Sequence, residues 1–405
     1  MLWFHITLTA FVCILLVWDG LFFMPRALVY NFPIDLGMRR NEIICAHDGI
    51  DSFDIFERKI ESDQFCGWDR PDKPNEIKGN RGFVHAYPAW HTTIFWWYGS
   101  VSKKTCVIIM MVMYLCSFVW VCKWTYDRMP YSDMTHCISD VLFFLVMLLY
   151  SINYIIMTLN YGLFLLGCSC LLYVLLEQKN EILAGIVFSL LMIKPQIGVL
   201  FMIPLIINRY YKTIVIAGLL CVIETLFTAW KLDKSPIELI LQISKIGAPY
   251  SKGNITQAFI NVIGPIGQYV SMAMFAAIVS AGCFLLRNAK DVMVRFLPAI
   301  AFVPFWTYSQ NHDWIFVLPC CLYIVKNSQK WPRLYELCFL LAILRALVLS
   351  AHSHHYYSIG KYGFAYVLFL LINSICCLMA VLNENNKWDY RNLLHKLKSL
   401  KKGNV

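Results

Sequence analysis

Long apolar runs recur along almost the whole chain and are the feature that most constrains its fold. Runs long enough to cross, or nearly cross, a hydrocarbon core of about 30 Å cover residues 2–24, 105–122, 137–154, 158–177, 213–230, 262–286, 296–309, 313–325, 334–350 and 363–382. Two shorter pieces between residues 182 and 208 flank Lys194-Pro195-Gln196. Each is too short to span alone at 1.5 Å per residue, so they predict a hairpin or a broken helix.

Composition supports the same interpretation. Of 405 residues, 59% are hydrophobic and only 15% are charged, whereas soluble domains carry about 25% charged residues. We therefore expect an all-α, polytopic transmembrane protein of about 11–12 membrane segments. The net charge of +10 is better explained by membrane topology than by nucleic-acid binding, so no nucleic-acid partner is expected.

Lys and Arg in the short loops set the predicted orientation. The basic turns 177–181, 208–212, 287–295 and 326–333 alternate as cytoplasmic. The short aromatic stretch 88–101 must then be re-entrant, because counting it as a span breaks the alternation. The sequence predicts one membrane domain over residues 1–386, with 25–87 as a large first extracytoplasmic loop. A basic amphipathic tail, 387–405, follows on the cytoplasmic leaflet.

The first loop holds the densest cluster of carboxylates, eleven Asp and Glu against nine Lys and Arg. Asp35 lies about ten residues beyond the first span, where a short interfacial helix would place its carboxylate beside a lipid-linked substrate. Glycosyl transfer needs one base to accept the proton of the attacking hydroxyl. Asp35 is the first candidate for that base, and Asp48 and Asp51 are the alternatives. A solvated surface role is the ordinary explanation for any of them.

Five other side chains are candidates for substrate binding. Tyr87 and His91 open the aromatic stretch before residue 101, which is either a cavity wall or an ordinary interfacial belt. Lys194 and Arg345 are cations within apolar sequence, expensive there and so functional candidates, unless they snorkel to the interface. His312 lies in a polar break beside Asp313, which is itself a candidate N-cap. These candidates together predict an anionic, lipid-linked substrate on the extracytoplasmic face.

Two acidic residues and most of the cysteines also lie in apolar sequence. Glu224 and Asp140 also lie inside apolar runs and are possible partners of the buried cations. No Cys or His spacing matches a zinc site, and most of the 16 cysteines sit where Cys acts as a small hydrophobe. No metal and no cofactor are therefore expected.

The order of several loose motifs resembles a known family. Asp35 follows the first span, Gly49-Ile-Asp51-Ser-Phe53 stands where that family has G-x-D-P-Y/F, and Tyr87-Pro88-Ala89 resembles its YPP element. The "AGIVFSLLMIKPQ" stretch and the break Ser309–Asp313 complete the set. Ala89, Ser52 and the "NYG" of residues 160–162 depart from the pattern. The arrangement resembles glycosyltransferase family 87, the polyprenol-phosphate-mannose-dependent α-mannosyltransferases of the GT-C superfamily.

The resemblance implies an inverting transfer of a hexose, with mannose as the first candidate, from a polyprenyl-phosphate donor to a glycolipid or cell-surface glycan. It implies a GT-C-like fold in a bacterial inner membrane, with surrounding membrane lipids, an Asp base and phosphate-binding cations. Two other functions compete. A polysaccharide polymerase or ligase would carry its large outer loop late in the chain, whereas here it comes first. A lipid or sugar flippase would show two related halves, and none is visible.

Overall fold

The computed structural model describes residues 10, 34–52, 87–129, 134–242, 255–305, 311–350 and 359–384. Within these ranges every regular element is a helix, which confirms the predicted all-α class. The predicted first span, 2–24, lies outside the described residues apart from residue 10, and the predicted tail, 387–405, lies outside them altogether. One contiguous cluster of buried apolar side chains extends from Leu36 to Ala380.

Among the residues that the structure describes, four helices are long and apolar enough to cross a membrane. They are α7 (Lys103–Tyr126), α12 (Tyr211–Leu232), α15 (Ile266–Leu286) and most of α19 (Ile359–Glu384). Only 22% of the apolar window of α7 is buried, and side chains such as Leu115 are exposed. Apolar side chains on that scale face lipid, so these helices are membrane spans. The protein is therefore a multi-pass membrane protein.

The remaining helices pack among the spans. They are α8 (Met134–Thr158), α9 (Gly162–Glu177), α10 (Glu181–Leu191), α11 (Pro195–Ile207), α14 (Ile255–Ile263), α16 (Val292–Phe302), the 3-10 helix η2 (Asn311–Val317), α17 (Leu318–Lys326) and α18 (Pro332–Ser350). The predicted break is confirmed, since α10 ends before Lys194 and α11 begins at Pro195. Proline suits the first helical position because its missing N–H has no partner there.

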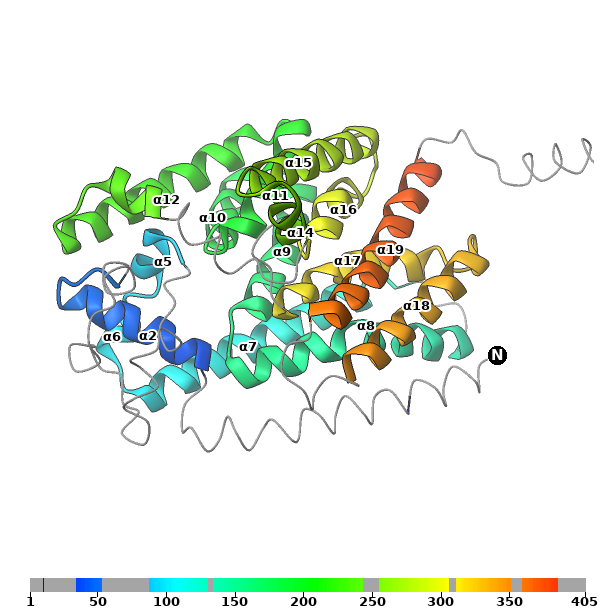
Figure 1. Ribbon diagram of the computed structural model, residues 1–405, viewed down its shortest axis with the longest axis horizontal. Helices are drawn as coiled ribbons and strands as arrows, with labels where there is room; N and C mark the ends of the chain where they lie inside the picture. The colour runs from blue at the N-terminus through cyan, green and yellow to red at the C-terminus, as the bar shows by residue number, and fades with distance from the viewer. Residues whose placement is uncertain are drawn as a thin grey trace, which may run out of the picture.

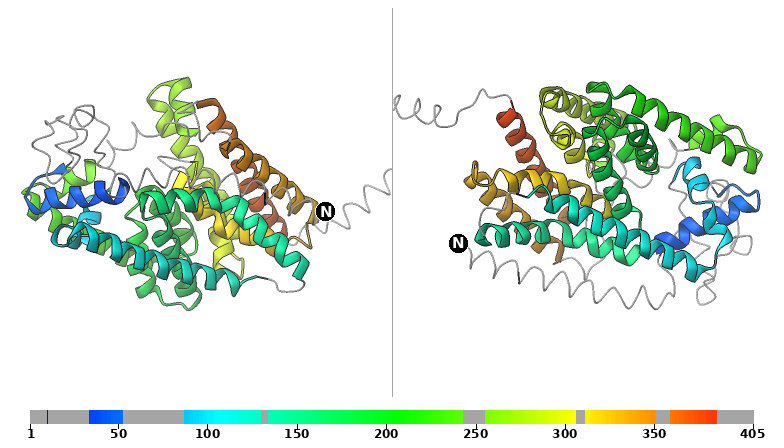
Figure 2. Two further views of the ribbon diagram at one scale, coloured as in Figure 1. Left: turned by 90° about the horizontal axis from the view of Figure 1, so that it is seen from below. Right: turned by 180° about the vertical axis from the view of Figure 1, so that it is seen from behind.

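Three short helices gather at one end of the bundle, beside one end of α12 (Figure 1). They are α2 (Ile34–His47), α5 (Ala89–Ile94) and α6 (Trp97–Ser100). Helices of six and four residues cannot cross a bilayer, which agrees with the prediction that 88–101 is not a span. The reverse view keeps this group at the same end of the molecule, with α7 leading away from it (Figure 2).

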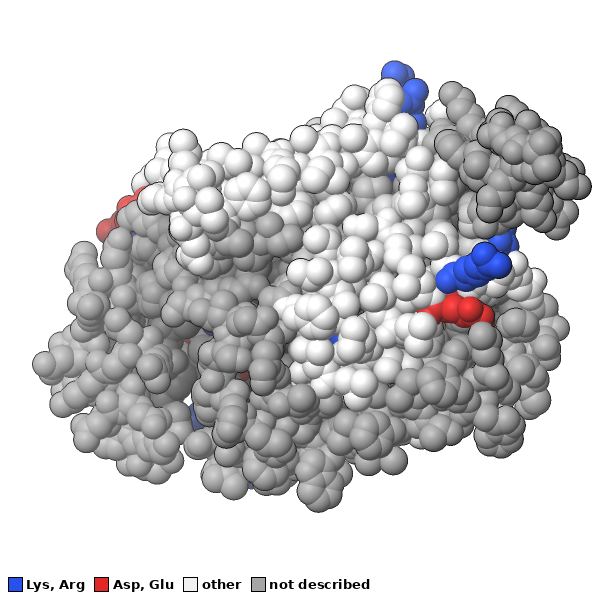
Figure 3. Space-filling view, turned by 45° about the vertical axis from the view of Figure 1, so that its right-hand side comes forward, with Lys and Arg blue, Asp and Glu red and all other residues white. Residues whose placement is uncertain are grey.

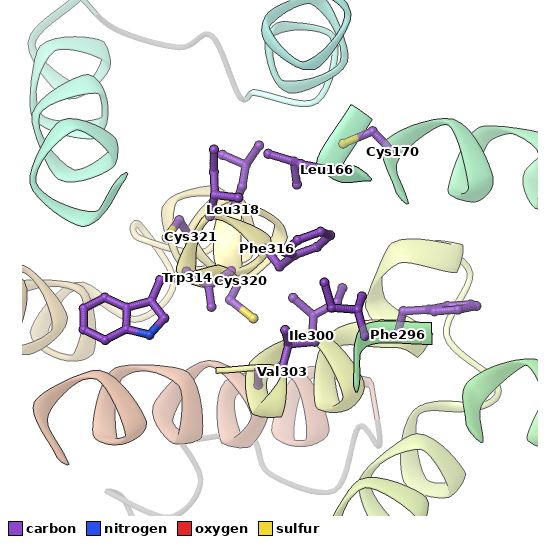
Figure 4. Packing of buried hydrophobic residues seen from close by; sticks show 14 of the residues in the cluster. Leu166, Cys170, Phe296, Ile300, Val303, Trp314, Phe316, Leu318, Cys320 and Cys321 are labelled. Atoms are coloured by element: carbon purple, nitrogen blue, oxygen red, sulfur yellow. The ribbon is translucent and has the colours of Figure 1, made fainter. Parts of the chain in front are cut away.

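A core of buried apolar side chains holds η2 and α17 in place. Aromatic and aliphatic side chains of η2 and α17 pack against α9 on one side and α16 on the other; the labelled residues are Leu166, Cys170, Phe296, Ile300, Val303, Trp314, Phe316, Leu318, Cys320 and Cys321 (Figure 4). The cysteines here are buried among apolar neighbours, as predicted. On the face in Figure 3 the described surface is mostly uncharged, with charged side chains near its margins.

Candidate active site

Lys194 occupies the break between α10 and α11 and is buried with two polar partners. Its side chain is 2% exposed. The Nζ donates to Asp313 Oδ1 at 2.6 Å and to Asn160 Oδ1 at 2.8 Å. Pro195 prevents the helix from continuing through this point, so the chain turns and the ammonium reaches the interior. Buried cations inside membrane proteins pair in this way and mark functional sites.

Asn160 links Lys194 to the predicted base. It lies just before α9, and its Nδ2 donates to Asp35 Oδ2 at 2.9 Å. Its Oδ1 also accepts from the backbone N–H of Gly162 at 3.2 Å. The amide oxygen therefore faces the cation and the amide nitrogen faces the carboxylate, the only orientation that satisfies both. A continuous polar chain thus runs Asp35–Asn160–Lys194–Asp313.

Asp35 stands in the first turn of α2, where the helix dipole favours a negative charge. Its side chain is half-buried, whereas Lys194 and Asp313 are enclosed. One carboxylate oxygen accepts from Asn160. A partly exposed carboxylate with one anchored oxygen can accept a proton from a group that approaches from outside.

Aromatic side chains in α5 and just before α5 and α9 lie in this region. The His91 Nε2 lies 2.9 Å from the Tyr161 hydroxyl. The Tyr87 ring is 4.6 Å from that of His91 and 5.4 Å from that of Tyr161, centroid to centroid. Trp90 Nε1 donates to the carbonyl of Met192 at 2.9 Å, which ties α5 to the helix break. The predicted pair Tyr87 and His91 therefore lies beside the polar chain.

An ion pair in α2 lies one turn beyond Asp35. Arg39 Nη1 contacts Glu42 at 2.6 Å, with both side chains buried, and its guanidinium carbon lies 4.7 Å from the centre of the Tyr87 ring. Burial raises the pKa of Glu42 to about 8, although Arg39 opposes that rise. The negative charge of the Asp35 carboxylate raises the pKa of Glu42 further.

Arg345 and His312 are the two remaining predicted phosphate-binding residues, in α18 and η2 respectively. The Arg345 guanidinium is fully buried and stacks 4.4 Å from Trp314 and 4.3 Å from Phe369, measured to the ring centres. Its Nη1 donates to the Met147 carbonyl at 3.3 Å, while Nε and Nη2 have no hydrogen-bond partner among the described residues. Arg345 makes no hydrogen bond to the polar chain. The backbone of His312 lies in η2 beside Asp313.

The two alternative carboxylates lie elsewhere. Asp48 is exposed just after α2. Asp51 is buried, and its Oδ2 accepts from Lys234 Nζ and from Gln242 Nε2, both at 2.7 Å. Lys234 follows α12, so Asp51 fastens the first loop to the segment after that span. Neither carboxylate joins the polar chain that contains Asp35.

The structure adds residues that sequence reasoning missed. Asn160 was visible only as a departure from a motif. Asp313 was noticed as a cap, but it is the ion-pair partner of Lys194. Glu224 and Asp140 were possible partners of the buried cations, but the carboxylate that pairs with Lys194 is that of Asp313. Asp140 accepts a hydrogen bond from a tyrosine hydroxyl at 3.1 Å. The partner of Lys194 comes from η2 because the helix break points the ammonium inward.

The site combines three chemical capacities. The Asp35 carboxylate can accept a proton. The Lys194 ammonium supplies positive charge in a low-dielectric interior, and the Tyr87–His91 pair supplies an aromatic surface with hydrogen-bonding groups. In the described part of the chain, no three His, Cys, Asp or Glu side chains converge to hold a metal ion.

Comparison with known protein families identifies the family of the chain. Residues 85–303 match the family model described as Glycosyltransferase family 87, a match that covers more than half of the 405 residues. The matched region contains Tyr87, His91, Asn160 and Lys194, whereas Asp35 and Asp313 flank it. No curated protein and no solved structure matches the chain. The chain belongs to glycosyltransferase family 87.

Proposed function

We propose that this membrane glycosyltransferase transfers a hexose, with mannose as the first candidate, from a polyprenyl-phosphate donor to a glycolipid or cell-surface glycan. Transfer takes place on the extracytoplasmic face of a bacterial cell membrane. Family membership establishes the reaction class, and the donor, acceptor, base and membrane side are our proposal.

One observation carries the proposal. The polar chain Asp35–Asn160–Lys194–Asp313 brings together side chains from four distant segments. It ends in a half-buried carboxylate at one side and a buried ion pair at the other. A lipid-linked phosphosugar requires both functions close together, a base for the acceptor and a cation for the leaving phosphate.

Asp35 acts as the general base. The acceptor hydroxyl transfers its proton to the Asp35 carboxylate as its oxygen attacks the anomeric carbon, and the bond from that carbon to the phosphate oxygen breaks. Attack from the opposite side inverts the configuration. The structure favours Asp35 over the alternatives because Asp51 is already neutralised by Lys234 and Asp48 lies outside the polar chain.

Lys194 stabilises the departing polyprenyl phosphate. An ammonium has three N–H donors, and two of them are engaged by Asn160 and Asp313. The third remains for a phosphate oxygen. His312 and Arg345 are further candidates for that phosphate, since His312 precedes Asp313 in η2 and Arg345 stacks on Trp314. No metal is needed in this scheme because the donor carries a single phosphate.

Tyr87 and His91 bind the sugar. Both are buried, and they lie within ring-contact distance of each other. Asn160 Nδ2 lies 3.5 Å from the Tyr87 hydroxyl, which connects this aromatic surface to the base and the cation. Sugar rings pack on aromatic faces while their hydroxyls take hydrogen bonds, so the pair fits one wall of a hexose site.

The test begins with the purified protein, extracted membrane glycolipids and radiolabelled polyprenyl-phosphate mannose, with the glucose donor run separately. We expect transfer from one of the two donors. Asp35→Asn should lower turnover by about 100-fold or more and leave donor binding intact. Asp48→Asn makes the same chemical change on an exposed carboxylate and should stay active. A fully active Asp35→Asn enzyme would exclude Asp35 as the base.

A further inference from the structure

A second polar site lies at the other end of α11 from Lys194. The turn after α11 and the turn between α15 and α16 enclose a surface pocket of about 570 Å³, a size suited to a small ligand. Helices α11 and α15 pack side by side (Figure 1). Since α11 has 13 residues, about 20 Å of helix separates this pocket from Lys194.

The pocket is strongly basic. Three arginines line it, Arg209 from the first turn, Arg287 from the second and Arg295 from α16. No carboxylate is among the residues that line it. The nearest acidic residue along these turns, Asp291, accepts from the backbone N–H of Met293 at 2.9 Å. Three guanidinium groups that line one pocket, with no carboxylate in its lining, favour an anionic ligand.

Two of the arginines are held in place by the protein. Arg295 Nε donates to the carbonyl of Ala289 at 2.7 Å, and its Nη1 donates to the Tyr210 hydroxyl at 3.2 Å. Arg287 stacks 3.6 Å from the centre of the Phe284 ring. A guanidinium has five N–H donors in a fixed plane, so both keep donors for a ligand after these contacts. Planar donors held in this way suit phosphate oxygens.

The surroundings of the pocket indicate where its ligand comes from. Phe284, which lines the pocket, is 57% exposed, and the neighbouring Leu285 and Ile206 are 50% and 47% exposed. Such apolar surface on membrane helices faces acyl chains. The basic turns 208–212 and 287–295 are on the side assigned as cytoplasmic, where anionic lipid headgroups attract basic pockets. A ligand with a phosphate group and acyl chains can bind the arginines and contact the exposed apolar side chains at the same time.

We propose that this pocket binds the phosphate group of an anionic phospholipid from the surrounding leaflet. The headgroup contacts Arg209, Arg287 and Arg295, and the acyl chains lie along the exposed apolar faces of α11 and α15. This site is separate from the candidate active site and does not depend on the identity of the sugar donor.

The experiment measures lipid binding to the delipidated full chain in detergent by native mass spectrometry. Phosphatidylglycerol and phosphatidylcholine are titrated separately, and glycerol phosphate is added as a soluble competitor. The double variant Arg209→Gln/Arg287→Gln is compared with the wild type. Arg295 is left intact because it holds the turn between α15 and α16. Arg333→Gln is the matched control, an exposed arginine at the start of α18 that does not line the pocket.

The wild type should prefer phosphatidylglycerol. Each basic residue near the surface contributes about fivefold, so the double variant should bind it roughly 25-fold more weakly, while the control should be unchanged. Three results would overturn the proposal. These are equal binding of phosphatidylcholine, retention of phosphatidylglycerol by a folded double variant, and displacement by glycerol phosphate at the same concentration as the lipid. The last result would identify a soluble phosphate ester as the ligand.

Discussion

Removing the ammonium of Lys194 is the sharpest test of the buried ion pair. Lys194→Met keeps most of the apolar stem but leaves the Asp313 carboxylate without its cation. The two side chains are only 2% and 1% exposed, with 2.6 Å between Nζ and Oδ1, so water cannot replace the lost partner. Breaking a buried pair from one side costs about 3–5 kcal/mol of unfolding free energy. We expect a loss of that size.

Two further variants test whether burial of the two charges causes this loss of stability. Lys123 makes an ion pair of almost the same length with Asp127, 2.7 Å, but the side chains are 64% and 48% exposed. Lys123→Met should therefore cost only about 0–1 kcal/mol. The double variant Lys194→Met/Asp313→Leu removes both charges and should recover most of the lost stability, since apolar replacements of buried pairs are often neutral. Donor affinity should stay low in both variants that lack Lys194.

The assay is equilibrium unfolding of the purified proteins in mixed micelles, paired with binding of radiolabelled polyprenyl-phosphate mannose. A Lys194→Met loss no larger than that of Lys123→Met would refute the burial argument, because the ammonium would then have reached water. Unchanged donor affinity in Lys194→Met would leave the lysine a purely structural role.

Three other changes test neighbouring features. The folded-state pKa of Glu42 is raised to about 8, so the unfolding free energy should fall as pH rises from about 4.5 to 8. Glu42→Gln should flatten that slope in pH-dependent unfolding, and equal slopes would contradict the assignment. A Cβ at Gly185 would lie 2.7 Å from Ile216 Cβ, whereas one at Gly218 meets nothing within 4 Å. Gly185→Ala should cost about 1–3 kcal/mol in the same assay, and Gly218→Ala should cost far less. Asp51→Asn loses a buried ion pair and should lower stability while sparing turnover; lost turnover with normal stability would make Asp51 the base.

Helix boundaries were predictable where proline or the length of apolar sequence decides them. Pro195 marked the break that separates α10 from α11, and the residues before α7 were correctly judged too short to span. The predicted run 262–286 was too long, because Gly264, with φ of +73°, and Pro265 separate α14 from α15. The Gly-Pro dipeptide was a readable turn signal that the apolar content of the run concealed.

The site was only partly predictable. The sequence singled out Lys194 because an ammonium in apolar sequence is costly, and it singled out Asp35 because a carboxylate beside a span is chemically useful. It could not show that Asn160 joins them, since helical periodicity places residues on a face but does not say which distant segment meets that face. The partnership with Asp313, 119 residues further along the chain, depends on how η2 packs between α9 and α16.

The polar chain also explains why the helix break and η2 occur together. A continuous helix through Lys194 would satisfy its own backbone and turn the ammonium toward a neighbouring helix or lipid, where an unpaired cation is expensive. The break directs the ammonium inward, and a carboxylate must then be delivered at the same depth. Irregular backbone at membrane depth is tolerated only inside protein or beside a cavity. The burial of Trp314 against Tyr366 and Phe369, at 5.0 and 5.3 Å between ring centres, holds η2 where Asp313 can supply that carboxylate. Trp314→Ala should therefore loosen the packing of η2 and lower donor affinity, although Lys194 itself is unchanged.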